Sequence, residues 1–293
     1  MNNLGEIQES TMSVVCHDAG AANLIVHWLK KYQGTILPCM AGPAIKIWNY
    51  HFPEVEILRL DSAISNSKIL LSGTGNNSFE HDARIKAKDK GMYNISVIDH
   101  WTRYKQRFVF NGKEVLPDLI LVSDHFARRL AKDTFPLIKV KELSNQYLES
   151  EKKSVFRLKR NPVAIPPKNI LIVTENFKVN SSDGQSLDFE SLNYFIGNLD
   201  KINKEQDFVV RIRPHPSESY KKYKEFKQKE INIQISKNLS LHQDLAWADM
   251  VVGMQSFAMV VSQHCNIPTI SIIPPDSIRC VLPYREILSL RDL

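Results

Sequence analysis

Short apolar runs alternate with longer amphipathic stretches through the first half of the chain. The runs predict strands at residues 12–17, 34–40, 55–60, 68–73, 94–99, 118–123 and 138–143. Stretches with apolar residues mainly on one side predict helices at residues 21–32, 41–52, 79–91 and 126–135. Short apolar strands that alternate with helices are typical of a parallel sheet covered on both faces. The pattern therefore predicts a doubly wound α/β domain over residues 1–150.

A change of composition separates this part from the next. Residues 151–168 combine charged residues with three prolines and little periodicity, which favours an interdomain linker. From residue 169 the alternation restarts, with strands predicted at 169–173, 207–213, 231–236, 249–253 and 268–274. We therefore expect a second Rossmann-like domain over residues 169–293, and a cleft between the two domains.

Composition narrows the classes of function. The chain has 293 residues, a net charge of +6 and 43% apolar residues. This mild basic bias suits phosphates, anionic sugars or a membrane surface better than nucleic acid. Its four cysteines form no CxxC pair, so neither a zinc site nor a thioredoxin-type site is indicated.

The cellular setting follows from what the sequence lacks. We see no signal-peptide pattern at the N-terminus and no apolar run of about 18 residues that would span a bilayer. We expect a cytoplasmic protein that needs no metal or cofactor and binds no nucleic acid. Peripheral membrane association, a homodimer and membership of a longer protein all stay open.

Small residues and a His–Asp pair follow the first predicted strand. In HDAGAAN, residues 17–23, Asp18 is a candidate general base or a group that orients His17. The alternative is a plain turn in which Asp18 caps the helix. In SGTGNNSFE, residues 72–80, Gly73 and Gly75 fit a loop that cradles an anion, and an ordinary capping box explains the same letters.

A dense group of polar and aromatic residues follows the strand at 94–99. Asp99 and His100 are a candidate proton-transfer pair, Trp101 a surface for stacking on a sugar or base, and Arg103 a phosphate ligand. A surface helix with a half-buried tryptophan is the alternative. After the next strand, Asp124 is explained well enough as a helix cap.

The stretch RIRPHPS concentrates cations and prolines at the end of a strand. We expect one of Arg211 and Arg213 on each side of the strand, and a rigid His215 between two prolines, with Ser217 beside it. Such a loop suits a departing diphosphate, whereas a structural Pro-His-Pro turn is the alternative.

The last candidate loop precedes an almost wholly apolar helix. In GMQS, Ser256 can cap the helix while the backbone around Gln255 presents N–H groups to a phosphate. A cap with no ligand explains the same pattern.

RPHP, SLHQDLAWAD, GMQS and IPTISI together resemble the C-terminal half of two-domain GT-B glycosyltransferases. The likeness covers about residues 205–273. It is strongest to transferases of capsule, lipopolysaccharide and teichoic-acid assembly. Bacterial polysialyltransferases and CDP-glycerol glycerophosphotransferases carry similar His-Pro and serine motifs. The resemblance implies that His215 and Ser256 contact the donor phosphates.

The implied activity is a glycosyltransferase of bacterial surface polysaccharide biosynthesis. It would move a sugar, phosphosugar or polyol phosphate from a phosphate-activated donor to a glycan or lipid-linked glycan acceptor, without a metal. We expect Asp18 or Asp99 to act as base with the neighbouring histidine, and Arg103 and the two glycines of residues 73–75 to help bind the donor.

One departure from the family pattern leaves alternatives open. Many GT-B enzymes carry a glutamate one turn into the helix that here reads FAMVVSQHC, where it holds a ribose. Without it, phosphoribosyl diphosphate is an alternative to a sugar nucleotide as donor. A sugar-nucleotide 2-epimerase and a binding module without catalysis remain further alternatives.

Overall fold

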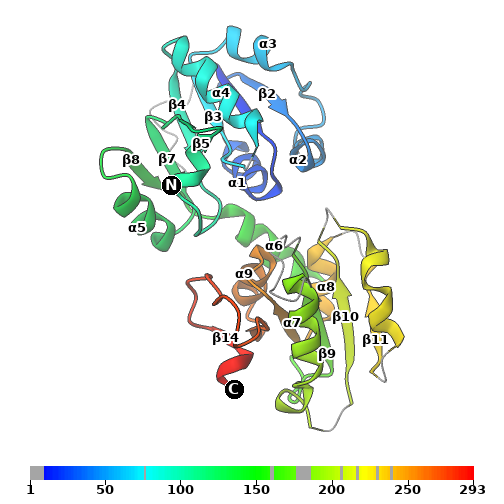
Figure 1. Cartoon of the computed structure of the whole chain (residues 1–293). Coiled ribbons are helices and arrows are strands. Elements are labelled where there is room, and N and C mark those ends of the chain that lie inside the picture. The colour runs from blue at the N-terminus through cyan, green and yellow to red at the C-terminus, as the bar shows by residue number, and fades with distance from the viewer. Residues whose placement is uncertain are drawn as a thin grey trace. The chain divides into compact units, whose positions relative to one another are not determined.

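The structure of this chain is a computed structural model (Figure 1). It describes residues 10–75, 77–158, 162–175, 186–204, 207–215, 218–228, 231–237 and 240–293. The chain divides into two compact units, Met1–Tyr147 and Leu148–Leu293, which we call the first and second domains.

A six-stranded parallel sheet forms the centre of the first domain, in the order β2-β1-β3-β4-β7-β8. Its strands are β1 (Met12–Cys16), β2 (Ile36–Met40), β3 (Ile69–Ser72), β4 (Tyr93–Val97), β7 (Leu119–Val122) and β8 (Lys139–Glu142). The helices are α1 (Ala19–Leu29), α2 (Pro43–His51), α3 (Leu60–Ser65), α4 (Ser78–Asp89), the 3₁₀ helix η1 (Lys105–Phe108) and α5 (His125–Thr134).

Alternation of side chains along β1 explains why both faces of this sheet are covered. Val14 and Cys16 lie in one apolar cluster with residues of α1 and α2. Val15 lies in a second cluster with Ile64 of α3 and Ala83 of α4. Successive residues of a strand point to opposite faces, so a run that is apolar at nearly every position needs helices on both sides.

The second domain also has a six-stranded parallel sheet, in the order β11-β10-β9-β12-β13-β14. Its strands are β9 (Asn169–Val173), β10 (Val209–Arg213), β11 (Ile233–Ile235), β12 (Met250–Gly253), β13 (Thr269–Ser271) and β14 (Ile287–Ser289). The helices are α7 (Leu187–Ile196), α8 (Leu241–Trp247), α9 (Phe257–His264) and the 3₁₀ helices η2 (Leu199–Lys201), η3 (Tyr220–Gln228) and η4 (Leu290–Asp292). One core cluster joins Ile172 and Ile212 of the sheet to Phe195 of α7.

Two predicted segments differ from the structure. Residues 55–59, part of a predicted strand, lie outside the sheet, and α3 begins at Leu60. Their apolar side chains pack against the first-domain core as an unpaired segment, which produces a strand-like pattern without a strand. The segment 151–168, predicted as a linker, begins inside helix α6 (Gln146–Arg157).

The end of that segment is held within the second domain by a single carboxylate. The Asp249 carboxylate accepts hydrogen bonds from the backbone N–H groups of Ala164, Lys168 and Asn169. Two further elements were not expected, a short antiparallel hairpin of β5 (Val109–Phe110) and β6 (Lys113–Glu114), and strand β14.

Each sheet has a point where successive connections run in opposite directions. It lies between β1 and β3 in the first domain and between β9 and β12 in the second. In doubly wound sheets, loops at the carboxyl ends of strands beside this switch point form the usual ligand site. No helix in the described part of the chain is long and apolar enough to cross a membrane.

Candidate active site

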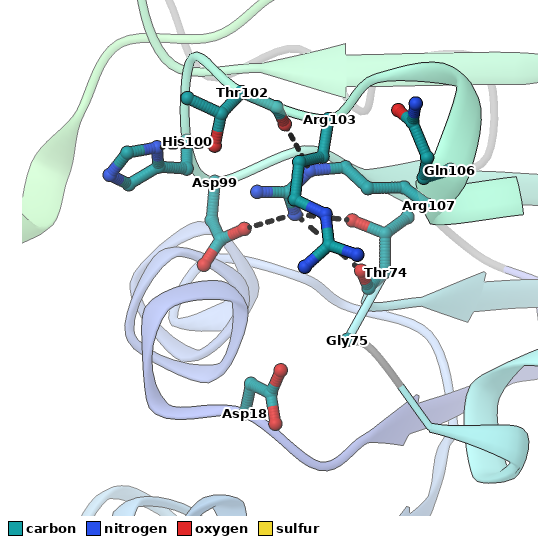
Figure 2. A pocket seen from close by; sticks show the side chains of 9 residues that line it. All are labelled: Asp18, Thr74, Gly75, Asp99, His100, Thr102, Arg103, Gln106 and Arg107. Atoms are coloured by element: carbon teal, nitrogen blue, oxygen red, sulfur yellow. Dashed lines mark hydrogen bonds and ion pairs between the residues drawn. The ribbon is translucent and has the colours of Figure 1, made fainter. Parts of the chain in front are cut away.

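Three loops meet at the carboxyl end of the first-domain sheet. These loops follow β1, β3 and β4, and β1 and β3 are the two strands beside the switch point. Together they form a pocket of about 260 Å³ (Figure 2). Its lining residues are Asp18, Thr74, Gly75, Asp99, His100, Thr102, Arg103, Gln106 and Arg107.

An arginine at the back of the pocket binds the three-loop framework together. Arg107 Nη1 lies 2.9 Å from Asp99 Oδ1 and 3.1 Å from Thr74 Oγ1, while its Nε donates to the Thr102 carbonyl at 3.0 Å. The Asp99 and Arg107 side chains are only 19% and 15% exposed. The charge of Asp99 is therefore already matched by a cation, which makes this carboxylate a weak candidate for a base.

Asp18 has a different environment in the same pocket. Its side chain is 44% exposed, and its Oδ1 lies 2.6 Å from His17 Nδ1. Asp18 makes no side-chain cap to α1, so the capping alternative is wrong. The carboxylate is oriented by a neighbouring imidazole and still reaches solvent, as a general base for an incoming hydroxyl must.

Two glycines allow these carboxylates to approach the backbone. A Cβ added at Gly20, in the first turn of α1, would lie 1.9 Å from Asp99 Oδ2. A Cβ at Gly75 would lie 2.4 Å from Asp18 Oδ2. A side chain at either position would displace a carboxylate oxygen from its place in the pocket.

Helix α4 supports the pocket loops through two buried charged residues one turn apart. Glu80 Oε1 accepts from His17 N at 3.0 Å, and Glu80 Oε2 accepts from Gly75 N at 3.1 Å. Arg84 donates to the carbonyls of Gly73 and Arg107. Burial raises the pKa of Glu80 to about 7 and lowers that of Arg84 to about 10. Glu80 is thus no part of a capping box at the start of α4, which Asn77 caps instead.

Trp101 was predicted to stack on a sugar or base, and the structure places it elsewhere. Only 7% of the residue is exposed, and its indole N–H donates to both carboxylate oxygens of Asp124. Asp124 also caps α5 through the N–H of Ala127, as expected. Trp101 therefore anchors the loop after β4 and offers no free face to a ligand.

In the second domain, the switch point carries a carboxylate that the sequence analysis missed. Glu175, just after β9, accepts from Gln255 N at 2.8 Å. Burial raises the pKa of this carboxyl group to about 7, with the nearby Glu218 adding to the rise. The Gln255 N–H, predicted to face a phosphate, is thus occupied by an acidic side chain. Ser256 caps α9 by accepting from Ala258 N.

His215 belongs to a loop that is fixed by a second glutamate. Its backbone N–H donates to Thr174 Oγ1 at 3.0 Å and to Glu218 Oε2 at 3.2 Å. Glu218 also accepts from Tyr223 and Lys222, and its side chain is 4% exposed. Burial lowers the pKa of His215, so its imidazole is neutral near pH 7. Ser217 lies outside the described residues.

The two arginines of β10 share one face, which corrects the expectation of one on each side. Residues two apart on a strand point the same way. Arg211 Nη1 lies 3.3 Å from Oδ1, and Arg213 Nη1 lies 2.7 Å from Oδ2, of the fully buried Asp244. Arg211 also stacks over Trp247 at 3.7 Å. Their charges hold α8 against the sheet.

The predicted residues thus form two groups. In the first domain Asp18, Gly75, Asp99, His100 and Arg103 line one pocket, beside His17 and Gly73. In the second domain His215, Gln255 and Ser256 follow strands beside or next to the switch point. Within the described residues, no group of three or more His, Cys, Asp or Glu side chains could hold a metal ion.

No protein-family model and no curated protein matches this sequence. Among solved structures, one named as a UDP-N-acetylglucosamine 2-epimerase from Listeria monocytogenes superposes with a TM-score of 0.58 at 11% identity. The alignment covers 90% of this chain and 79% of that one. This likeness supports the predicted GT-B-like α/β fold of two parallel-sheet domains. At such low identity it shows the fold alone.

Two further solved structures are much less similar. A Thermosulfurimonas dismutans KpsC, a beta Kdo 2,7 transferase, gives a TM-score of 0.31 at 13% identity, over 94% of this chain and 83% of that one. A solute-binding protein from Agrobacterium vitis with bound alpha-D-tagatopyranose gives 0.33 at 11% identity, over 90% and 76%. Neither likeness is strong enough to carry an argument.

Proposed function

We propose that this protein is a glycosyltransferase that moves a sugar from a phosphate-activated donor to a hydroxyl of a glycan acceptor. The observation that carries the proposal is the half-exposed Asp18 carboxylate, which lines a pocket at a switch point and is oriented by His17. The GT-B-like fold is compatible with such a reaction, and the motifs at His215 and Ser256 resemble those of surface polysaccharide transferases.

Asp18 acts in this proposal on the acceptor. It takes the proton of the attacking hydroxyl while the hydroxyl oxygen forms a bond to the anomeric carbon of the donor. The bond from that carbon to the donor phosphate oxygen breaks, and the electron pair leaves with the phosphate. His17 keeps the carboxylate in one orientation, since their side chains are 2.6 Å apart. Such a base typically contributes about 10²- to 10⁴-fold to the rate.

The second domain receives the donor phosphates in this proposal. The amino end of α9 supplies N–H donors at the carboxyl end of the sheet, and the loop that carries His215 supplies its imidazole. Glu175 accepts the Gln255 N–H, so a bound phosphate would have to replace this carboxylate or approach the neighbouring donors. The donor is a sugar nucleotide or phosphoribosyl diphosphate, and the acceptor a glycan or lipid-linked glycan.

The test combines a donor panel with one matched pair of variants. The protein is incubated with UDP-, GDP-, CDP- and CMP-activated sugars, CDP-glycerol and phosphoribosyl diphosphate, each with neutral and acidic oligosaccharides. Mass spectrometry should show an acceptor heavier by the transferred group. Asp18→Asn should lower the rate about 10²- to 10⁴-fold. Asp61→Asn, which changes a side chain that is 81% exposed, should leave it unchanged. Full activity of Asp18→Asn would contradict the proposal.

Epimerisation of a sugar nucleotide is a second candidate. Two carboxylates, Asp18 and Asp99, line the same pocket, and the Listeria protein that shares the fold is named as a 2-epimerase. An epimerase needs no acceptor. Incubation of UDP-N-acetylglucosamine alone in D₂O should then give a product that carries deuterium at the inverted carbon, whereas a transferase leaves the sugar unlabelled.

A further inference from the structure

Arg103 stands out in the first-domain pocket because its guanidinium is exposed and lacks a partner among the described residues. This side chain makes no hydrogen bond or ion pair to the residues that the structure describes, although it lines the pocket together with Asp18 and Gln106. The other arginine of the pocket, Arg107, is bonded to Asp99, Thr74 and Thr102. Of the two arginines in the pocket, Arg107 is paired within the protein and Arg103 can bind a ligand.

The backbone of Arg103 adds a second observation. Its φ of 58° lies in the left-handed region, which residues with a side chain rarely adopt. The Arg103 carbonyl accepts from Arg107 N at 3.1 Å, so this turn is tied to the arginine that organises the pocket. Figure 2 shows the Arg103 side chain extending into the space bounded by Asp99, Thr74 and Gly75. Strain of this kind persists where the surrounding structure maintains it, often at ligand sites.

The charges that line the pocket indicate that a ligand should bring an anionic group to Arg103. Asp99 is paired with Arg107, and Asp18 is hydrogen-bonded to the His17 imidazole. Among the described residues, the pocket thus presents an exposed carboxylate, Asp18, that can accept a hydroxyl proton, and a guanidinium, Arg103, that no carboxylate matches. A guanidinium fork matches the two oxygens of a carboxylate or phosphate better than any neutral sugar hydroxyl. Covering Arg103 with a neutral ligand would remove water from a cation without supplying an opposite charge.

We propose that the first-domain pocket binds an acidic sugar as acceptor, with its carboxylate or phosphate on Arg103 and its hydroxyl directed toward Asp18. This inference rests on the proposed function and names the acceptor class that the function leaves open. The pocket volume of about 260 Å³ suits a single sugar ring rather than a longer stretch of glycan. Gln106, also exposed at the rim, offers an amide donor to the same anion.

The experiment measures binding rather than turnover, so its result does not depend on finding the donor. Isothermal titration of the full chain would use methyl β-D-glucuronide, its neutral isostere methyl β-D-glucoside, and glucose 6-phosphate. The wild type should bind the better of the two anionic sugars about three- to tenfold more tightly than the neutral one. The order of glucuronide and glucose 6-phosphate shows whether a carboxylate or a phosphate is preferred.

Variants separate a specific contact from general charge. Arg103→Gln should remove the preference for an anion, and Arg103→Lys should keep part of it because a lysine retains the charge without the fork. Lys105→Gln removes the same charge two residues away, on an exposed side chain outside the pocket, and should keep the preference.

Several results would overturn the inference. The first is equal or undetectable binding of all three sugars at tens of millimolar. The second is an anion preference that survives Arg103→Gln. The third is an Arg103→Gln variant that loses binding of UDP or phosphoribosyl diphosphate but keeps binding of the glucuronide. Transfer to neutral and acidic acceptors at equal rates would also overturn it and leave the proposed function intact. Binding of acidic sugars without any transfer would instead contradict the proposed function.

Discussion

A glutamate lies at the switch point of each domain, and the two carboxylates do different work. Glu80 is fully buried, comes from helix α4 and accepts two backbone N–H groups from two different loops. Glu175 is partly buried, comes from the loop after β9 and accepts one N–H, that of Gln255 beside the cap of α9. In both groups burial is the largest cause of a pKa raised to about 7.

The difference lies in what remains available to a ligand. In the first domain Glu80 accepts the N–H groups of His17 and Gly75, and we propose that the side chains of Asp18 and Arg103 bind the ligand. In the second domain Glu175 lies where the amino end of α9 would bind an anion. We infer that Glu80 is a fixed brace, whereas Glu175 is a group that a phosphate can replace.

The largest effect that separates these roles concerns stability. Glu80→Ala would leave the backbone N–H groups of His17 and Gly75 without their acceptor beside a fully buried side-chain position, which costs roughly 2–6 kcal/mol of unfolding free energy. Glu175→Ala removes one hydrogen bond at a partly buried site, with a cost of about 1 kcal/mol. Urea denaturation of the two variants measures the contrast. Equal losses would mean that Glu80 is not a brace.

A smaller effect concerns pH. Glutamate has an ordinary pKa of 4.5, and burial raises that of Glu80 to about 7 in the folded protein. Between these values the folded state binds more protons than the unfolded state, so stability decreases as pH rises from about 4.5 to 7 and then levels off. The decrease from Glu80 should be roughly 3 kcal/mol.

Paired denaturation curves can isolate this contribution. The difference in unfolding free energy between wild type and Glu80→Gln should move by that amount in favour of the variant as pH rises through this window. The exposed Glu54→Gln should follow the wild type at each pH. A difference that stays constant with pH would show that Glu80 is ionised in the same range folded and unfolded.

The strands of the two sheets could be predicted from the sequence because most of them are short local runs of apolar residues. Runs such as residues 119–122 and 169–173 are apolar at nearly every position and are followed by polar loops. Residues 55–60 carry a similar signal for another reason, since apolar side chains of an unpaired segment also pack on the core. Pattern alone does not distinguish pairing from packing.

The candidate active site could be predicted from the sequence only in part. His17, Asp18 and Asp99 follow predicted strands, so their place at one edge of the sheet could be expected. Glu80 resembles any acid in the first turn of a helix, and its acceptor role depends on His17, 63 residues away. The contact from Glu175 to Gln255 spans 80 residues.

The arginines of β10 teach a related lesson. Arg211 and Arg213 looked like phosphate ligands because they end a strand, but their partner Asp244 lies on a helix that follows a later strand. The two-residue period of a strand does predict that they share a face. Which anionic group lies on that face depends on the tertiary structure.

The central claim is that the first-domain loops bind the acceptor and the second-domain loops bind the donor phosphates. Hydrogen–deuterium exchange with one ligand at a time tests it most directly, with methyl β-D-glucuronide for the acceptor and inorganic diphosphate for the donor. We expect the glucuronide to slow exchange in residues 98–107 alone, and the diphosphate to slow it in residues 213–215 and 255–260 alone. Protection of residues 98–107 by diphosphate, or of residues 255–260 by glucuronide, would contradict the division of roles.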